Sequence, residues 1–478
     1  MGIKEYHTFL KDSDDGCSVT LQKYLFNIAD NKHLNAFTEV YTDECIERAK
    51  QLDAKRKNGE PLKKLHGVII ALKDVISYKD HQLTASSNIL KGFTSIYNAT
   101  AVGRLLAEDA IIIGNCNCDE FAMGSTNENS CYGNVLNAQD ITRVPGGSSG
   151  GSAVAVQADL CMISLGSDTG GSVRQPADFC GIIGLKPGYG RISRYGLIAY
   201  ASSFDQIGIF GNTVEDVGIV LNVISGEDDF DSTVSNNPVP ELDLNESNLN
   251  KKKYRIAYFK NALEHSSLDP EIRESFLTLR DKLKLDGHYV EMIDFDLLSY
   301  IVPTYYVLTT AEASSNLSRY DGIRYGSNSP GSECDLTQFY TKTRTTGFGR
   351  EVKRRIMLGT FVLSSGYYDA YYSKAQQIRK LLVVSTVNIF KKYDAIVMPT
   401  VPKPAYKIGE MMKDPIEMYL ADIYTVYANL TGIPAISIPL FKHSNGLPFG
   451  AQIMTNRYNE LTLLEISDLL LTGFKGNE

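Results

Sequence analysis

Short apolar runs of strand length alternate with longer mixed segments along this chain. Residues 66–74 and 109–114 are apolar at nearly every position rather than at alternate positions. Continuous runs of this kind are typical of strands that are buried on both faces of a sheet. Further short apolar runs predict strands at 181–187, 254–259, 394–399 and 433–439. Strands that alternate with helical segments indicate an α/β fold.

Helical spacing is clearest in three parts of the chain. The segment before residue 53 has Leu34, Phe37, Val40 and Tyr41 at helical spacing, and it is followed by a charged loop at 54–64. Further helices are predicted at 216–224 and, with many tyrosines, over roughly 270–392. Residues 226–253 are rich in acidic residues, Asn, Ser and Pro, which predicts a polar surface linker or excursion.

Two loops rich in glycine and serine flank one apolar segment within residues 144–187. The first reads Gly-Gly-Ser-Ser-Gly-Gly-Ser at 146–152, and the second reads Gly-Ser-Asp-Thr-Gly-Gly-Ser at 166–172. Glycine at this density indicates a backbone that turns sharply or approaches another group closely. A short apolar segment can bring both loops to one edge of a sheet, so Ser148 and Ser172 are candidates for a shared site. Tight turns and helix caps are the other interpretation.

Two familiar serine and glycine motifs fit this region poorly. Residues 146–150 match the nucleophile-elbow pattern Gly-x-Ser-x-Gly, but the polar residues before them, with Pro145, make a poor central strand. The later histidines, His265, His288 and His443, lie in polar or linker-like contexts, which disfavours a Ser-His-Asp hydrolase. No Gly-Lys-Ser/Thr follows the glycines, which disfavours a phosphate-binding loop.

Lys73 is an alternative base, because it ends the apolar run at 66–74. A lysine accepts a proton only when it is neutral, so its pKa of ~10.4 must fall by roughly 3 units to work near neutrality. Burial at the end of an apolar strand favours such a shift. A salt bridge with Asp74 or another acid is the competing interpretation.

Charge and composition narrow the function classes. The net charge is −8 and the pI is about 5.5, which argues against this chain holding nucleic acid alone. The eight cysteines are scattered without a Cys-x-x-Cys pair, which indicates reduced thiols and no metal site. The N-terminus lacks the apolar core of a signal peptide, and no apolar run reaches the ~20 residues of a membrane helix. We therefore expect a cytoplasmic protein.

The two glycine and serine blocks, together with Ala-Leu-Lys-Asp at 71–74, resemble the amidase signature family over nearly the whole chain. The resemblance implies one amidase domain over residues 1–478, built on a large mixed β-sheet core with helices on both faces. It also implies a Ser-cis-Ser-Lys triad, in which Ser172 is the nucleophile, Ser148 the bridging serine and Lys73 the base. Its oxyanion hole is expected from the backbone N–H groups of Thr169, Gly170, Gly171 and Ser172.

Within this family the chain is most similar to the A subunits of glutamyl-tRNA(Gln)/aspartyl-tRNA(Asn) amidotransferases. The segments that carry this similarity are 119–128, 312–322, 352–359 and 364–372. It implies a glutaminase that forms an acyl-enzyme and delivers ammonia to the B subunit, with a small C subunit bracing the pair. The B subunit would use ATP and Mg²⁺ and contact the tRNA, and this chain would need no cofactor of its own.

Free glutamine carries a carboxylate and an ammonium group, so its pocket needs one charge of each sign. Arg355 resembles the carboxylate-binding arginine of these subunits, and its planar fork suits two oxygens. Asp422 resembles the ammonium partner, and Met123 and Ser125 match other substrate-binding positions. Arg354 lies beside Arg355, and only the motif alignment favours one over the other.

Two other functions compete with the glutaminase. The chain could be a stand-alone amidase acting on a small-molecule or peptide amide, but the paired pocket charges argue against that. It could also be an inactive scaffold, but the intact triad argues against that. The tyrosines at 367–372 are predicted to pack between helices rather than to contact substrate.

Overall fold

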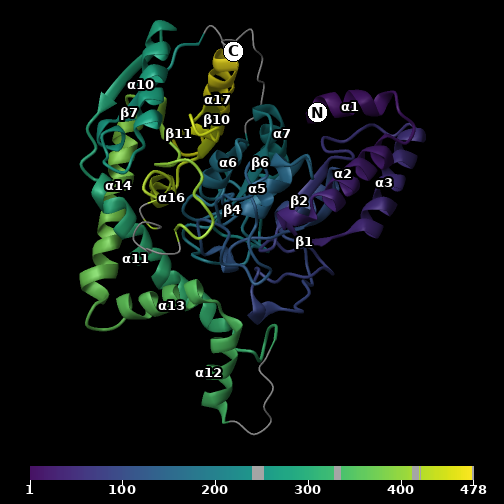
Figure 1. Cartoon of the computed structure of the whole chain (residues 1–478), viewed down its shortest axis with the longest axis horizontal. Coiled ribbons are helices and arrows are strands. Elements are labelled where there is room, and N and C mark those ends of the chain that lie inside the picture. The colour runs from purple at the N-terminus through teal and green to yellow at the C-terminus, as the bar shows by residue number, and fades with distance from the viewer. Residues whose placement is uncertain (240–251, 328–334, 412–418, 420, 476–478) are drawn as a thin grey trace.

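Eleven strands form one mixed sheet in the computed structural model, which describes residues 1–239, 252–327, 335–411, 419 and 421–475 (Figure 1). Their order across the sheet is β1-β3-β2-β4-β6-β5-β10-β11-β9-β7-β8. The strands are β1 (Phe37–Val40), β2 (Ile69–Lys73), β3 (Ile111–Cys116), β4 (Ile163–Asp168), β5 (Ile183–Lys186), β6 (Gln206–Gly211), β7 (Arg255–Phe259), β8 (Tyr289–Ile293), β9 (Ala395–Pro399), β10 (Ala435–Lys442) and β11 (Pro448–Thr455).

Strand direction places the lysine and the second glycine-rich loop at the same edge of the sheet. Strand β2 runs parallel to both of its neighbours, β3 and β4. Lys73 is the last residue of β2, and Asp168 is the last residue of β4. The carboxyl ends of parallel neighbours meet at one edge, so the loop that follows Asp168 begins close to Lys73.

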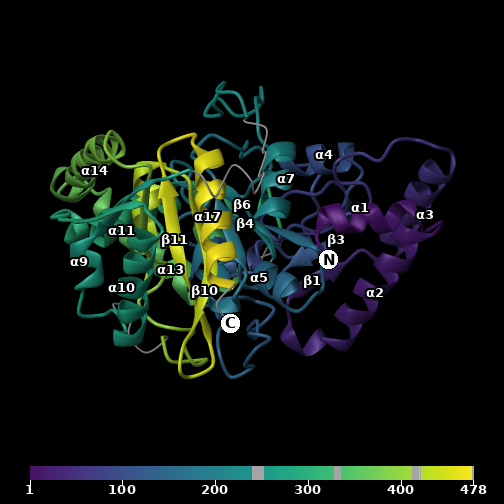
Figure 2. The ribbon, with the colours of Figure 1, turned by 90° about the horizontal axis from the view of Figure 1, so that it is seen from above.

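Helices cover both faces of the sheet (Figure 2). Every residue of β2, β3 and β4 is buried, as the continuous apolar runs predict. The α-helices are α1 (Ile3–Lys11), α2 (Gly16–Asp30), α3 (Thr42–Lys57), α4 (Thr100–Ala107), α5 (Gly150–Gln157), α6 (Arg174–Cys180), α7 (Val214–Ile224), α9 (Lys260–Leu263), α10 (Pro270–Leu285), α11 (Leu298–Asn316), α12 (Leu336–Gly347), α13 (Arg350–Val362), α14 (Lys374–Phe390), α16 (Val426–Thr431) and α17 (Glu460–Lys475). The predicted α/β fold with a large mixed sheet is confirmed.

Short helical turns connect several of these elements. They are η1 (Lys32–Leu34), η2 (Asn88–Leu90), η3 (Glu120–Ala122), η4 (Leu317–Arg319) and η5 (Asp369–Ser373), of which the last is a turn of π-helix. Helices α5 and α6 contact each other and pack on the central strands. Helix α5 begins at Gly150, within the first glycine and serine block, and α6 begins just after the second, so packing on the sheet fixes where both loops end.

Three local predictions are wrong. Residues 37–40 form the edge strand β1, which pairs with β3, because a four-residue edge strand gives too short a pattern to distinguish from a helix. The loop predicted from residue 54 begins later, because α3 continues to Lys57 with basic residues favourably placed in its last turn. The segment 270–392 contains strand β8, which pairs parallel with β7 and is only partly buried.

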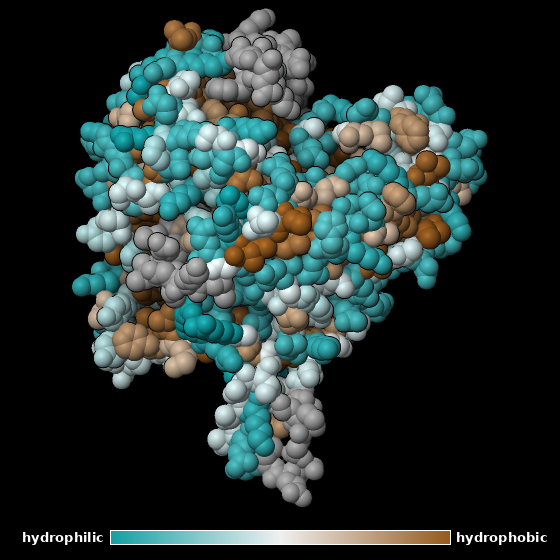
Figure 3. Space-filling view, in the orientation of Figure 1, coloured by the Kyte–Doolittle hydropathy of each residue, from teal (hydrophilic) through white to brown (hydrophobic). Residues whose placement is uncertain are grey.

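The polar excursion predicted at 226–253 lies partly outside the described residues, at 240–251. Helix α12 extends away from the body of the molecule, a projection also visible in the space-filling view (Figures 1 and 3). Among the residues that the structure describes, no helix combines the length and apolar character needed to span a membrane.

Candidate active site

Lys73 lies at the centre of the candidate site, and its side chain is fully buried. Its Nζ contacts three serine hydroxyls, at 2.7 Å from Ser148 Oγ and 2.9 Å from both Ser149 Oγ and Ser167 Oγ. Desolvation by burial lowers the pKa of Lys73 to about 8, against the weaker opposing effect of Cys118 and nearby carboxylates. The lysine is therefore set up to lose its proton close to neutral pH.

The competing salt bridge with Asp74 does not form. Asp74 instead accepts hydrogen bonds from the backbone N–H groups of Thr84 and Ser86, at 3.0 and 2.9 Å. In the described part of the chain, no carboxylate lies within ion-pair distance of Lys73.

The predicted neighbour of Lys73, Ser148, is joined to Gly147 by a cis peptide bond.

Ser172 lies in the loop between β4 and α6 and is 8% exposed, whereas Ser148 is completely buried. The Ser172 carbonyl oxygen accepts a hydrogen bond from Ser149 N–H at 3.2 Å, which ties the two glycine and serine loops together. Among the described residues, Ser172 Oγ has no hydrogen-bond partner. The structure thus brings both predicted loops together and leaves the Ser172 hydroxyl unengaged.

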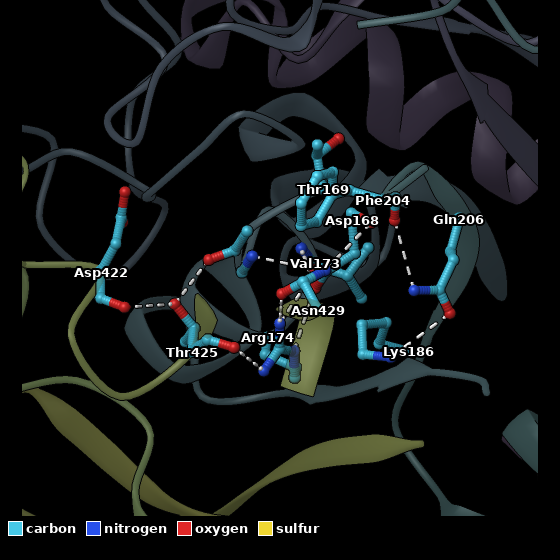
Figure 4. Close-up of polar contacts among 12 residues, drawn as sticks. Asp168, Thr169, Val173, Arg174, Lys186, Phe204, Gln206, Asp422, Thr425 and Asn429 are labelled. Atoms are coloured by element: carbon cyan, nitrogen blue, oxygen red, sulfur yellow. Dashed lines mark hydrogen bonds and ion pairs between the residues drawn. The ribbon is translucent and has the colours of Figure 1, made fainter. Parts of the chain in front are cut away.

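A buried ion pair holds the Ser172 loop in shape (Figure 4). Arg174 Nη2 lies 2.9 Å from Asp168 Oδ1, and both side chains are fully buried. The same carboxylate accepts the N–H groups of Gly171 and Val173, at 2.9 and 3.1 Å. Burial alone would raise the pKa of Asp168, but the Arg174 guanidinium prevails and holds it well below its usual range.

The backbone donors predicted for an oxyanion hole are not equivalent. The N–H of Gly171 is already used by Asp168, whereas those of Gly170 and Ser172 have no acceptor among the described residues. A Cβ atom at Gly170 would collide with the Tyr305 hydroxyl, and one at Gly171 would collide with Thr425. Gly171 also has φ of +130°, so this position requires glycine on two grounds.

Arg355 points inward from α13 and is 3% exposed. Its Nε donates to Glu351 Oε1 at 2.9 Å, and its Nη1 donates to the Tyr200 hydroxyl at 2.8 Å. Burial alone would lower the pKa of Arg355, but Tyr200 and Glu351 outweigh it, so the guanidinium stays charged. The side chain of Arg354 is 30% exposed and shares Glu351, so the structure favours Arg355 as the inward-facing cation.

Asp422 and Ser125 come together from distant parts of the chain. Ser125 Oγ donates to Asp422 Oδ1 at 3.1 Å, and the Tyr306 hydroxyl donates to Asp422 Oδ2 at 2.7 Å. The Tyr306 ring also lies 5.6 Å from the Arg355 guanidinium. Burial raises the pKa of Asp422 to about 6, opposed by Tyr306 and by the charge of Arg355. One buried cluster, bridged by Tyr306, thus holds the cation Arg355 with its partner Glu351 and the carboxyl group of Asp422.

The remaining predicted residues have simpler outcomes. Met123 is buried in the main core, two residues before Ser125. Tyr367, Tyr368 and Tyr371 are 42–44% exposed. The rings of Tyr367 and Tyr371 nevertheless pack against Phe361 of α13, at centroid distances of 4.3 and 5.8 Å, in line with the predicted helix packing. The histidines of the rejected Ser-His-Asp interpretation contact other groups, as when His288 accepts the N–H of Tyr254.

Several site residues carried no prediction from the sequence. They are Ser149, Ser167, Asp168, Arg174, Tyr200 and Tyr306. Asp168 and Arg174 gave a detectable signal, because they are charged residues within a glycine-rich and apolar stretch, the same signal that marked Lys73. Tyr200 and Tyr306 gave none. Within the described residues, no group of three His, Cys, Asp or Glu side chains could hold a metal ion, and the seven cysteines described are free.

Comparison with known proteins agrees with this geometry. Residues 20–464 match the family model described as Amidase. The chain is 49% identical over 471 residues to the A subunit of glutamyl-tRNA(Gln) amidotransferase from Chlorobaculum tepidum, an alignment covering 98% of each protein. The crystal structure of the A subunit of the same name from Thermotoga maritima has a TM-score of 0.80 and 38% identity, covering 98% of this chain and 93% of that one.

A more distant neighbour shares the architecture. Peptide amidase from Stenotrophomonas maltophilia has a TM-score of 0.80 and 26% identity, covering 96% of this chain and 94% of that one. The family model covers most of the chain, and its match includes both glycine and serine loops as well as the buried lysine. This chain belongs to the amidase family of enzymes.

Proposed function

We propose that this chain is the glutaminase subunit of a tRNA-dependent amidotransferase. The observation that carries the proposal is the buried cluster in which Arg355 and Asp422 offer one charge of each sign. Free glutamine presents an α-carboxylate and an α-ammonium group, so its two charges match those of Arg355 and Asp422. The similarity to relatives named as the A subunit of glutamyl-tRNA(Gln) amidotransferase supports the same assignment.

In the proposed reaction, neutral Lys73 takes the proton of Ser148, which takes the proton of Ser172. The Ser172 oxygen then attacks the side-chain amide carbon of glutamine. The tetrahedral intermediate collapses as its C–N bond breaks, and the leaving nitrogen takes up a proton and departs as ammonia. Water next attacks the γ-glutamyl ester on Ser172, which releases glutamate and restores the serine.

Hydrogen-bond accounting at Lys73 supports this direction of proton transfer. The hydroxyl hydrogen of Ser149 is donated to the Ser167 carbonyl at 3.1 Å, so Ser149 can only accept from Lys73. A neutral amine has two N–H groups and one lone pair. If Ser167 Oγ accepts the second N–H, the lone pair faces Ser148. Ser149 and Ser167 would thus orient the lysine toward its proton donor.

The negative oxygen of each intermediate needs donors that are already in place. We assign this role to the N–H groups of Thr169, Gly170 and Ser172, while that of Gly171 keeps the loop on Asp168. Each such donor typically contributes ~3–4 kcal/mol to transition-state stabilisation.

The proposal includes partners that this chain does not contain. Ammonia would pass to the B subunit, which would use ATP and Mg²⁺ to amidate Glu-tRNA(Gln) or Asp-tRNA(Asn) in the cytoplasm, with the C subunit bracing the pair. The net charge of −8 fits a chain that reaches tRNA mainly through a partner. No cofactor is assigned to this chain.

Replacing Arg355 by alanine tests the glutamine assignment. We expect the KM for glutamine to rise roughly 100-fold, because a buried charged hydrogen-bond partner of the substrate carboxylate is lost. Transfer from supplied ammonium should change less than about twofold, because that route bypasses the pocket. The measurement is product formation by the assembled complex with each nitrogen donor.

Arg354→Ala is the matched control for that experiment, because it removes a neighbouring arginine that is partly exposed and also bonds Glu351. We expect it to leave the KM for glutamine nearly unchanged. Equal losses with glutamine and ammonium in Arg355→Ala would count against the pocket.

A stand-alone amidase is the competing function. The native chain should co-purify with two further subunits, and mischarged tRNA with ATP should stimulate its glutaminase activity. A monomer that hydrolyses many amides would favour the stand-alone enzyme instead.

A further inference from the structure

Glu120 is a buried carboxylate for which the proposed reaction has no use. It is 4% exposed, and burial raises its pKa to about 7 against hydrogen bonds from Ser87 and Gly349. One carboxylate oxygen accepts the Ser87 hydroxyl, and the other accepts the N–H of Gly349 at 2.8 Å. Burying a carboxylate costs folding free energy that hydrogen bonds only partly offset. This arrangement therefore calls for an explanation.

The contact with Gly349 lies at the beginning of α13, the helix that carries Arg355. Gly349 is the N-cap residue, and it has no side chain with which to cap the helix. Glu120 reaches the N-cap N–H from 229 residues away, as the glutamate of a capping box does within one helix. A Cβ atom on Gly349 would collide with the Glu120 carboxylate, so glycine permits this approach.

Phe121, the residue after Glu120, contacts the segment before α13 through its apolar side chain. The Phe121 ring lies 5.6 Å from the ring of Phe348, the residue just before Gly349, and 4.9 Å from that of Tyr320. Phe121 has φ of +51° and Ala122 has φ of +58°, a left-handed pair that side chains disfavour. Such a turn persists only where its surroundings hold it, and here the contacts with 348–349 do so.

These contacts join two walls of the proposed glutamine pocket. The loop that begins with Glu120 continues to Ser125, which donates to Asp422. Helix α13 begins at the Glu120 contact and carries Arg355 on its buried side, where it meets Tyr200. The carboxylate therefore ties the segment on the anionic side of the pocket to the helix on its cationic side.

We propose that Glu120 is a positioning residue that fixes the start of α13 against the Ser125 loop and thereby sets the place of Arg355. The inference rests on the proposed function, because it gives Arg355 the glutamine carboxylate as its ligand. Glu120 itself does not touch the substrate in this account. Its effect should therefore appear in recognition of the carboxylate and not in the chemical step.

The test compares two substrates in Glu120→Ala and Glu120→Gln. With glutamine, we expect Glu120→Ala to raise KM about tenfold at nearly unchanged kcat, from loss of a helix-cap contact. With 4-aminobutanamide, which lacks the α-carboxylate, kcat/KM should match that of the parent enzyme. Glu120→Gln keeps an acceptor for Gly349 N–H, so its KM for glutamine should lie between those of the parent enzyme and Glu120→Ala. It serves as the only test variant if the alanine variant does not fold.

A double-mutant cycle with Arg355→Ala separates this inference from the proposed function. If Glu120 acts through Arg355, Glu120→Ala should have little effect on KM once Arg355 is gone. Equal effects in both backgrounds, while Arg355→Ala itself raises KM, would overturn the inference alone. An Arg355→Ala variant with unchanged KM would overturn the inference and the pocket together.

Asp53→Asn supplies the structural control. Asp53 is also a buried carboxylate that accepts backbone N–H groups at the start of a helix, those of Cys17 and Ser18 in α2. Among the described residues its hydrogen bonds go to Cys17 and Ser18 and not to the cluster of Arg355 and Asp422. Its variant should therefore lower thermal stability and leave KM for glutamine unchanged. A rise in KM as large as that of Glu120→Ala would show that loss of any buried cap produces the effect, and would overturn the inference.

Discussion

Replacement of Ser172 by alanine is expected to lower kcat for glutamine hydrolysis by about 10⁴-fold or more, the scale seen when a catalytic nucleophile is removed. The Ser172 hydroxyl is the slightly exposed member of the triad, and it has no hydrogen-bond partner among the described residues. Without it no γ-glutamyl ester can form. The measurement is glutamate release by the variant, together with its co-purification and its ammonium-dependent transfer, both of which should persist.

Ser152→Ala is the control for that loss. Ser152 belongs to the first glycine and serine block and is buried, but its hydroxyl donates to the Leu165 carbonyl, at 3.1 Å, rather than to a member of the triad. Its variant should retain most of the hydrolysis. Substantial glutamine hydrolysis by Ser172→Ala would reject the assigned nucleophile.

The second large effect is expected for Asp168→Asn. The change leaves Arg174 buried without its counter-charge, and breaking a buried pair in this way typically costs ~3–5 kcal/mol of folding stability. It also weakens the acceptor that holds the N–H groups of Gly171 and Val173, so the Ser172 loop should lose its shape. We expect a lower denaturant midpoint and a severe loss of activity in the fraction that remains folded.

Asp281→Asn provides the comparison for stability. Asp281 pairs with its neighbour Arg280 at 2.8 Å, but it lies on the surface, where water screens the pair. Its variant should show the same denaturant midpoint as the parent chain. If Asp168→Asn also unfolded at the parent midpoint and kept full activity, the loop would not depend on the ion pair.

The sequence predicted those parts of the site whose signal is local. Lys73 stood out as a charge at the end of an apolar run, and glycine density marked the loops of Ser148 and Ser172. The structure places Lys73 against Ser148 and ties the two loops together. Both features follow from short-range rules about burial and backbone freedom.

Other features depend on contacts between distant segments, which a single sequence does not encode as a pattern. Tyr306 meets Asp422 across 116 positions, and Glu120 meets Gly349 across 229. The sequence predicts a helix over the edge strand at 37–40 because Phe37 and Val40 are three residues apart, as on one helix face, whereas pairing with β3 makes this segment a strand. The charge of Arg174 is visible in the sequence, but its contacts with Thr425 and Asn429 join it to residues 251 and 255 positions away.

Covalent labelling of Ser172 with a sulfonyl fluoride, measured against pH, most directly tests whether an uncharged Lys73 activates this serine. Peptide mapping should place the label on Ser172. The labelling rate should rise with pH and level off above about 8, because the lysine loses its proton there. Labelling on another residue, or an unchanged rate and pH dependence in Lys73→Met, would contradict the account.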